Sequence, residues 1–383
     1  MIDKRIIQIS QPVTGEEEWQ EVKEPIMSGW LTSGPKVREF EKLFAEYHGV
    51  KHAYAVTSAT TALHLALVAL DIGQGDEVIV PAFTWVATAN VVRYCGAEVV
   101  FVDIDSATFN LDPKDLEKRI TSRTKAIIPV HLFGLCADMD AIKKIAPGIP
   151  LVEDAACAAG AMYKGAYAGG LGDIGCFSFH PRKSITTGEG GMVTTNDDDL
   201  AAKISKLRNH GAEISEEQRH HGPKPYILPD FNMLGFNYRM TDLQAAVGIV
   251  QMGKLERLIE ERDKWAKFYY ENLGDIDWLV LPKFDNGTYH HGWQSFVTMI
   301  NENKAPMSRN EIMERLQAQG ISTRPGTHAV HMLNYYRKLM RVDPNDFPGA
   351  KAANDYSMAI PLHNRMLPED FEYVVQAIKD IQQ

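Results

Sequence analysis

The stretch Ser178-Phe-His-Pro-Arg-Lys183-Ser-Ile-Thr-Thr-Gly-Glu-Gly-Gly191 contains the feature that decides how the chain is interpreted. The pattern predicts an apolar strand over residues 174–179 and a second strand over residues 192–195. Lys183 therefore leaves a buried strand, where loss of hydration disfavours the ammonium form and frees the amine as a nucleophile. Such an amine can form a Schiff base with a carbonyl. The alternative is an ordinary hydrated lysine on the surface.

Length and composition limit the classes of function. The chain has 383 residues, of which 45% are hydrophobic and 23% charged, with a formal net charge of −10. This length allows one large domain and a smaller one. The acidic balance argues against nucleic-acid binding through a basic face. We also expect no membrane association, because no apolar run is long enough to cross a bilayer.

The cysteines and the N-terminus indicate a compartment. The four cysteines show no CxxC spacing and stand in apolar surroundings, which is typical of free thiols in a reducing environment. The first residues are not followed by the apolar core of a signal peptide. A cytoplasmic location is therefore expected.

Strands and helices alternate regularly through the first half of the chain. The fold class expected from this alternation is α/β, with a mostly parallel sheet flanked by helices on both faces. Ligands of such sheets bind at the carboxyl ends of the strands. The expected strands cover residues 52–56, 77–81, 98–102, 126–130 and 150–153, and the expected helices cover residues 59–70, 84–94, 112–120 and 138–145.

The remainder of the chain follows a different pattern. The pattern predicts an entry arm over the first fifty residues and an irregular loop over residues 209–235. It also predicts one long helix over residues 242–273, which bridges two domains. A small α+β domain is expected after it. Its expected elements are strands over 292–300 and 321–324, with helices over 308–319 and 368–381. The chain is accordingly divided into a large domain, 1–250, and a small C-terminal domain, 251–383.

Two motifs at strand ends could hold parts of a ligand. Ser58, Ala59 and Thr60 lie between a strand and a buried helix, where hydroxyls and free backbone amides form an anion site. An ordinary helix N-cap is the alternative. Trp85 follows the next strand and could stack on a flat ring, or it could be a core residue.

A carboxylate completes the set. Asp154 ends a strongly apolar strand, where a bare charge is costly to bury. An aspartate facing a pyridinium nitrogen, with a Schiff-base lysine opposite, is the protein's contribution to pyridoxal phosphate (PLP) chemistry. The phosphate site, the ring stacker, Asp154 and Lys183 occur in a consistent order on one predicted sheet. Together they predict a PLP site.

At this point the sequence resembles the fold-type-I PLP-dependent aminotransferases that act on nucleotide-linked keto-sugars. The resemblance covers nearly the whole chain and rests on motifs that are specific in combination. They are Ser28-Gly-Trp-Leu-Thr-Ser-Gly34, Ser58-Ala-Thr-Thr-Ala-Leu-His64, Pro81-Ala-Phe-Thr-Trp85, Glu153-Asp-Ala-Ala156, Ser178-Phe-His-Pro-Arg-Lys183 and Gly235-Phe-Asn-Tyr-Arg-Met-Thr241.

The resemblance implies a role for each matching position. Lys183 would form the Schiff base and move the proton, Asp154 would pair with the pyridinium, and Trp85 would stack on the ring. Ser58, Ala59, Thr60 and Ser178 would hold the phosphate. Asn237 would reach the cofactor of the other subunit, which makes the active unit a homodimer. Cys157 stands where the family usually has Gln or His.

The resemblance also implies a reaction. The loop 186–191 resembles the branch that aminates carbon 4 of the sugar, perosamine synthase among them, with L-glutamate as the usual amino donor. That branch makes amino sugars of the kind found in lipopolysaccharide O-antigen. The related dehydratases carry histidine in place of the lysine, so Lys183 argues against their activity. Candidate contacts to the sugar nucleotide are Trp30, Leu31, Thr32, His180, Arg182 and Arg324. No metal site is expected.

Two alternatives stay open at this stage. One is a PLP aminotransferase that acts on a cyclitol or a keto-sugar acid. The other is a non-catalytic regulator of the same fold, which is disfavoured because both Lys183 and Asp154 are present. The sequence does not distinguish GDP, UDP and dTDP as the nucleotide.

Overall fold

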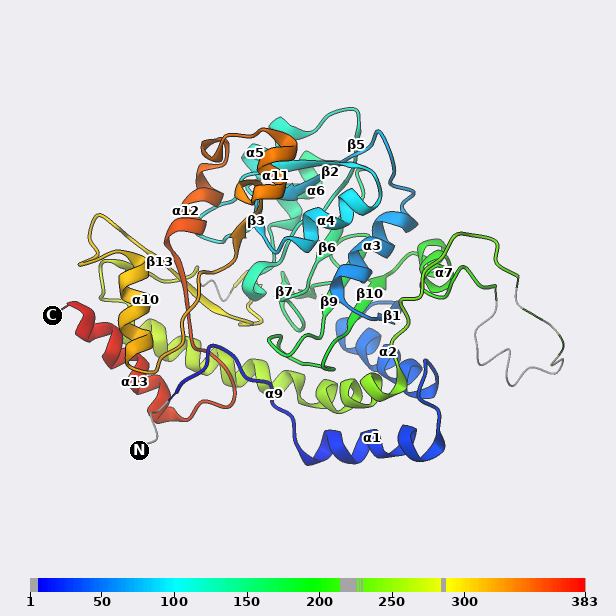
Figure 1. The fold of residues 1–383 in the computed structure, drawn as a ribbon, viewed down its shortest axis with the longest axis horizontal. Coiled ribbons are helices and arrows are strands. Elements are labelled where there is room, and N and C mark those ends of the chain that lie inside the picture. Colours follow the sequence, from blue (N-terminus) through cyan, green and yellow to red (C-terminus); the bar gives the residue numbers. More distant parts are fainter. Residues whose placement is uncertain (1–5, 214–225, 227, 229, 284–286, 383) are drawn as a thin grey trace.

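A computed structural model describes residues 6–213, 226, 228, 230–283 and 287–382, and its ribbon is shown in Figure 1. A central sheet carries the fold. One part has the strand order β1-β10-β9-β6 and the other the order β4-β2-β5. Parallel bridges from Ile127 to Leu151 and from Val130 to Asp154 join β5 to β6. The strands are β1 (His52–Val56), β2 (Glu77–Pro81), β4 (Glu98–Val102), β5 (Thr124–Ile127), β6 (Val152–Asp154), β9 (Ile174–Ser178) and β10 (Gly191–Thr195).

The sheet is mostly parallel, as the alternation of strands and helices predicts. Strand β2 pairs in parallel with β4 and β5, and β6 pairs in parallel with β9. Only β10, among these seven strands, runs antiparallel to its neighbours β1 and β9. The expected α/β fold class is confirmed.

Alternate residues of the strands face two separate cores. Val78 and Val80 belong to one hydrophobic cluster and Ile79 to the other. Helices cover both faces because each strand must bury both of its sides. The first cluster is covered by α3 (Ala59–Ala69), α4 (Ala87–Tyr94) and α7 (Asp198–Leu207); the second by α2 (Pro35–His48), α5 (Pro113–Arg119), α6 (Met139–Ile145) and α9 (Asp242–Leu273).

The long helix α9 links this layered unit to a third core. It begins at a capping box, in which the Thr241 hydroxyl accepts from the amide of Gln244. Its first half packs on α2 and on α1 (Glu16–Ser28), and its last turns join the third hydrophobic cluster. The helix runs along the lower side of the ribbon in Figure 1. The other elements of this part are β11 (Leu279–Val280), β13 (Phe296–Ile300), α10 (Arg309–Ala318), β15 (Ser357–Ile360) and α13 (Pro368–Lys379).

The C-terminal third also contributes to the first core. Strand β14 (His328–Ala329) pairs with β3 (Phe83–Thr84), and Tyr336 of α11 (Asn334–Met340) is buried in the first cluster together with residues of α12 (Pro348–Tyr356). A boundary at residue 250 lies inside α9. The division into residues 1–250 and 251–383 therefore stays a prediction.

Some element bounds differ from the expected ones for local reasons. The helix expected from residue 84 begins at Ala87, because Phe83 and Thr84 remain extended to pair with β14. The strand expected from residue 292 begins at Phe296, since Trp293 has a positive φ of 42°. Residues 321–324 form no named strand and contribute isolated bridges from Ile321 and Arg324 instead. Much of the irregular loop expected at 209–235 lies outside the described residues.

No helix within the described part of the chain combines the length and the apolar character that crossing a bilayer requires.

Buried neutral histidines make stability depend on pH. Burial lowers the pKa of His48 and of His363 to about 4, and that of His291 to about 3, from 6.5. A folded-state pKa below the unfolded one gives stability that is present above pH 6.5 and lost as the pH falls through the folded pKa. We expect the free energy of unfolding to fall by about 3 kcal/mol per histidine between pH 6.5 and pH 4.

Urea denaturation at a series of pH values measures this slope. His48→Gln should flatten it, because the ring of His48 accepts from Gly160 N and stacks on Phe44 at 4.1 Å in its neutral form. His52→Gln, at a half-exposed ring, is the matched control. An unchanged slope in His48→Gln would contradict the assignment.

Candidate active site

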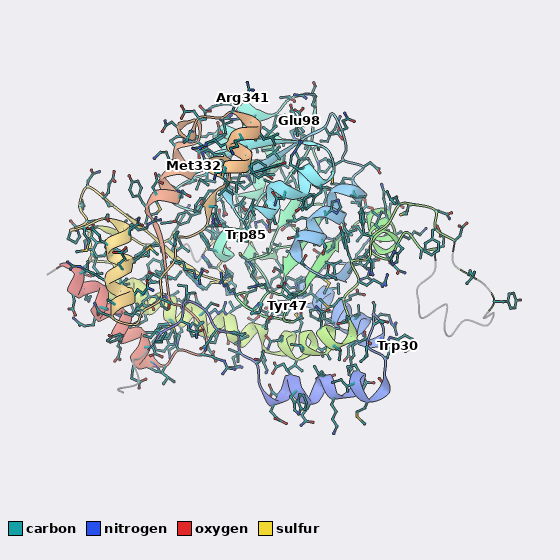
Figure 2. The ribbon with its side chains drawn as sticks, in the orientation of Figure 1. Trp30, Tyr47, Trp85, Glu98, Met332 and Arg341 are labelled. Carbon is teal, nitrogen blue, oxygen red and sulfur yellow. The ribbon has the colours of Figure 1, made fainter. Side chains whose placement is uncertain are left out.

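The predicted site residues meet along one edge of the central sheet. Ser58 follows β1, Trp85 follows β2 and β3, Asp154 ends β6, and Lys183 lies five residues beyond β9. The carboxyl ends of parallel strands share an edge, so these positions are brought together by topology. Figure 2 shows Trp85 near the middle of the molecule, where these strands end.

Asp154 is a buried carboxylate held by two donors. Its side chain is 5% exposed, Oδ2 accepts from Thr88 Oγ1 at 2.8 Å, and Oδ1 accepts from Ala156 N at 3.2 Å. Burial raises the pKa of Asp154, and the hydrogen bonds from Thr88 and Ala156 lower it by less. No Lys or Arg forms an ion pair with this carboxylate among the residues described. A cationic ring nitrogen would supply the missing charge partner.

Lys183 is half-buried, and its amine has a close partner in Cys157. Its Nζ donates to Cys157 Sγ at 3.1 Å, and its backbone amide donates to the carbonyl of His180 at 2.8 Å. The positive charge of Lys183 also lowers the pKa of Asp154, which places the two groups within electrostatic reach. Lys183 is therefore not an isolated surface lysine. Its amine lies beside the thiol of Cys157, the residue that stands where the family usually has Gln or His.

The loop after Lys183 is fixed on both sides. Thr186 Oγ1 donates to the carbonyl of Phe179 at 2.8 Å, and the amide of Thr186 donates to Gln251 Oε1 at 3.2 Å. Ser184 Oγ accepts from Nη1 of the buried Arg262 at 3.3 Å. Gln251 and Arg262 both lie on α9. The long helix thus holds the segment that positions the lysine.

The N-terminus of α3 forms an anion cradle. Ser58 caps the helix by accepting from Thr61 N at 3.2 Å, so the ordinary N-cap interpretation holds too. The amides of Ala59 and Thr60 have no carbonyl one turn before them and stay available to a ligand. Strand pairing of Val56 with Gly191, and of Gly191 with Ser178, places Ser178 near this turn.

Glycine is required at position 191 by close packing. A Cβ there would lie 2.5 Å from the carbonyl carbon of Ser58 and 2.7 Å from Ala59 N. Real side chains do not approach backbone this closely, so a larger residue would push α3 away from β10. The last glycine of the lysine loop therefore shapes the phosphate end of the site.

Trp85 is exposed and faces a ring from the C-terminal third. Its side chain is 60% exposed, which rules out the core alternative. The ring of His328 lies edge-on to it with centroids 5.6 Å apart. Strand β14, which contains His328, pairs with β3 directly before Trp85. The arrangement leaves an aromatic face open to a flat ligand.

The predicted sugar contacts divide into two groups. One group lies on segments that lead to the Lys183 and Trp85 side of the site and consists of His180, Arg182 and Arg324. In this group, the carbonyl of Arg182 accepts from Gln294 Nε2 at 3.0 Å. Trp30 to Thr32 form the turn between α1 and α2, and Figure 2 shows Trp30 well apart from Trp85. The structure does not bring this turn to Trp85 in one chain.

Asn237 lies on an exposed segment at the end of β1. It bridges to Asn209, and the next residue accepts from Thr57 N through its carbonyl at 3.1 Å. The side chain of Asn237 is exposed, so it is available to another molecule. The role that the resemblance implies for it stays a prediction.

Two residues of the site were not found from the sequence. Thr88 holds Asp154 and Arg262 holds Ser184, but neither stands in a motif. Thr88 follows Trp85 by three residues in an ordinary helical pattern, and Arg262 is one of several charged residues of α9. Only the fold shows that Arg262 is buried, at 3% exposure.

The residues present fit PLP. The free amides of α3 suit its phosphate, Trp85 presents a ring face, and Asp154 is a buried carboxylate that pairs with no Lys or Arg in the described ranges. Among the described residues, including His328 and His331, no group of three or more His, Cys, Asp or Glu side chains could hold a metal ion.

Comparisons with known proteins show the family of the chain. A profile of the DegT/DnrJ/EryC1/StrS aminotransferase family matches residues 12–379. The chain is 41% identical over 384 residues to GDP-perosamine synthase of Caulobacter vibrioides, with 100% of each chain covered. It is 40% identical over 386 residues to spore coat polysaccharide biosynthesis protein SpsC of Bacillus subtilis, covering 100% of this chain and 99% of the relative.

Solved structures show the same fold. An aminotransferase from Psychrobacter cryohalolentis superimposes with a TM-score of 0.92 at 31% identity, over 98% of both chains. The PLP form of the sugar aminotransferase Spr1654 from Streptococcus pneumoniae gives a TM-score of 0.91 at 29% identity, also over 98% of both. The chain belongs to the DegT/DnrJ/EryC1/StrS aminotransferase family and is a PLP-dependent sugar aminotransferase.

Proposed function

We propose that the chain transfers the amino group of L-glutamate to carbon 4 of a nucleotide-linked 4-keto-6-deoxy sugar. The observation that carries this proposal is that the buried carboxylate of Asp154 and the amine of Lys183 lie within electrostatic reach of each other at the sheet edge. The identity of 41% to GDP-perosamine synthase, over the full length, supports a substrate of this class.

Each residue has a defined task in this reaction. PLP, when bound, supplies an aldehyde for the lysine and a ring that takes up an electron pair. Asp154 keeps a proton on the ring nitrogen, and Thr88 fixes the direction of its carboxylate. Lys183 Nζ removes a proton from the substrate carbon in one half-reaction and returns one in the other. The amides of Ala59 and Thr60, with the hydroxyls of Ser58 and Ser178, hold the phosphate.

The proposal includes a homodimer with shared sites. Asn237 is exposed beside the end of β1, and the turn with Trp30, Leu31 and Thr32 lies away from Trp85 of its own chain. Both features suit contacts to a partner's site. The four cysteines are free, which supports a cytoplasmic location.

A substrate panel tests the proposed function. The purified enzyme, with PLP and L-glutamate, is offered GDP-, UDP- and dTDP-linked 4-keto-6-deoxy sugars, and products are identified by mass spectrometry. One nucleotide series should give an amino sugar together with 2-oxoglutarate. Amination of a cyclitol ketone, with all nucleotide sugars untouched, would replace this proposal by the cyclitol alternative.

A variant of Thr88 tests how Asp154 is held. Thr88→Val keeps the shape but removes the hydrogen bond to Oδ2, so kcat/KM should fall about tenfold and PLP should bind the apoenzyme more weakly. Thr194→Val is the matched control, because its buried hydroxyl donates to the carbonyl of Gly169 at 2.7 Å, away from Asp154. Equal PLP affinity in Thr88→Val and the wild type would show that this bond is unimportant.

A further inference from the structure

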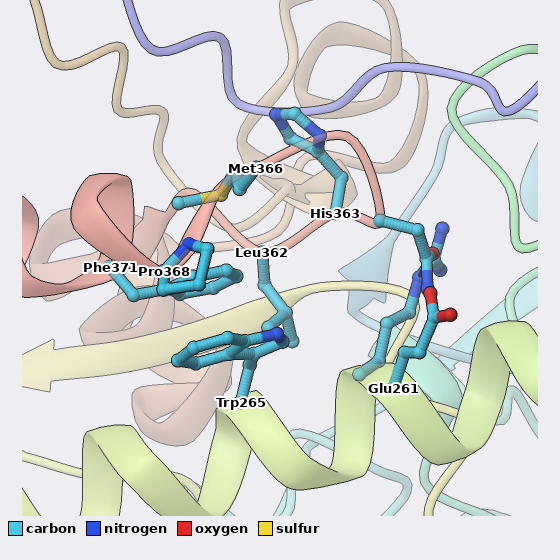
Figure 3. A pocket seen from close by; sticks show the side chains of 9 residues that line it. Glu261, Trp265, Leu362, His363, Met366, Pro368 and Phe371 are labelled. Atoms are coloured by element: carbon cyan, nitrogen blue, oxygen red, sulfur yellow. Dashed lines mark hydrogen bonds between the residues drawn. The ribbon is translucent and has the colours of Figure 1, made fainter.

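A pocket of about 210 Å³ lies behind the lysine loop, between α9 and the segment that links β15 to α13. Figure 3 shows Glu261 and Trp265 rising from α9 toward Leu362, His363 and Met366. Pro368 and Phe371, from the first turn of α13, close one end. None of these residues belongs to the PLP site.

A buried guanidinium faces this pocket without a complete set of partners. Arg262 lines the pocket and is 3% exposed. Its Nε donates to Asn364 Oδ1 at 2.8 Å, while Nη1 is used by Ser184 and by the Trp293 carbonyl. Nη2 has no acceptor anywhere in the described ranges. No carboxylate there forms an ion pair with Arg262, and burial lowers the pKa of its guanidinium to about 10.

The indole of Trp265 offers a second free donor. Its ring stacks on Phe371 with centroids 4.1 Å apart, and Figure 3 shows its nitrogen on the side of the pocket that faces Glu261. Nε1 has no acceptor in the part of the chain that is described. Three nitrogens in the same part are fully enclosed and have no partner, namely Arg93 Nε, Trp278 Nε1 and His331 Nδ1. Trp265 Nε1 and Arg262 Nη2 are not among these three. Both therefore border open space.

The other polar groups of the pocket are already satisfied. His363 Nε2 donates to the Gln8 carbonyl and its Nδ1 accepts from Arg365 N. Asn364 Nδ2 donates to Glu261 Oε2 at 2.8 Å, and Glu261 Oε1 accepts from Arg257 at 2.9 Å. Glu261 is thus bonded to Asn364 and Arg257, and within the described part of the chain the pocket offers no acceptor to Arg262 Nη2 or to Trp265 Nε1.

We propose that this pocket binds a small organic monocarboxylate with an apolar body. One carboxylate oxygen accepts from Arg262 Nη2 and the other from Trp265 Nε1, because a carboxylate is an acceptor with two oxygens. The apolar body packs on Leu362 and Met366. The carboxylate of Glu261 repels a second negative charge, so dianions such as phosphate and dicarboxylates are excluded.

The pocket is connected to the active site through one side chain. Arg262 donates to Ser184 Oγ with Nη1 and faces the pocket with Nη2. Ser184 directly follows Lys183, in the loop that α9 anchors. Binding itself does not require transamination. The test below therefore stands or falls independently of the proposed function.

Equilibrium dialysis of radiolabelled 3-phenylpropanoate tests the proposal. The protein is the holoenzyme, and the variants described below distinguish binding in this pocket from binding in the catalytic site. One mole should bind per chain. Unlabelled 3-phenylpropanoate should displace the label, whereas 3-phenylpropanamide, inorganic phosphate and 2-oxoglutarate should not. Absence of binding at millimolar probe would overturn the proposal.

Two variants locate the site. Trp265→Phe keeps the ring on Phe371 but removes the N–H, and should weaken binding about tenfold. Arg262→Lys should weaken it at least as much, although this change also disturbs Ser184. Trp19→Phe, at an exposed indole on α1, is the matched control and should bind like the wild type. Undiminished binding in Trp265→Phe would place the probe elsewhere.

Discussion

Lys183→Ala is expected to abolish transamination, with a fall in turnover of at least about 10⁴-fold. The change removes both the amine that joins the cofactor and the base that moves the proton. The fold should persist, because the half-buried side chain bonds to Cys157 alone among the residues that the structure describes. Stopped-flow assays of the amino-sugar product measure turnover, and circular dichroism measures the fold.

Two further variants sharpen this result. Lys183→Arg keeps a cation beside Cys157 but cannot form a Schiff base, so it should be as inactive as Lys183→Ala. Lys164→Ala changes an exposed lysine that pairs with Asp140, and should retain full activity. Turnover near the wild-type rate in Lys183→Ala would refute the assignment of the nucleophile.

Asp154→Ala is expected to lower kcat by about 10²–10³-fold, since it removes the charge that keeps the ring nitrogen protonated. Asp154→Asn should be nearly as slow, although an amide can retain the contact with Thr88. Both variants should still form the lysine–cofactor bond. This separates them from Lys183→Ala in an absorption spectrum.

Asp173→Asn is the matched control for Asp154→Asn. Asp173 also lies in the central layer and accepts from Leu151 N at 2.7 Å, but it is at the opposite end of β9 from Lys183. It should leave kcat within a few-fold of the wild type. Near-normal kcat in Asp154→Asn would show that another group pairs with the ring nitrogen.

The sheet was predictable because its strands obey simple patterns. Residues 77–81 and 98–102 are apolar runs bounded by turns, and both bounds agree with the structure. The helix over 242–273 was also predicted to the residue from its long helical pattern, and the structure adds that Thr241 and Gln244 form a capping box at its start. The residues within these elements determine their structure, so the elements can be predicted from the local sequence.

Features that depend on distant segments were not predictable. Phe83 and Thr84 stay extended because β14, more than 240 residues later, pairs with them. The same applies within the site. Asp154 and Lys183 end strands and carry recognisable chemistry, whereas Thr88 and Arg262 gain their roles only when folding brings them to Asp154 and Ser184.

The most direct test of the account is the visible absorption of the holoenzyme before and after addition of L-glutamate. We expect an absorption band of the lysine-bound cofactor that fades as pyridoxamine phosphate and 2-oxoglutarate form. A nucleotide-linked 4-keto sugar should then restore the band. A protein that shows no such band after incubation with PLP, or whose band does not respond to L-glutamate, would contradict the claim of a glutamate-dependent aminotransferase.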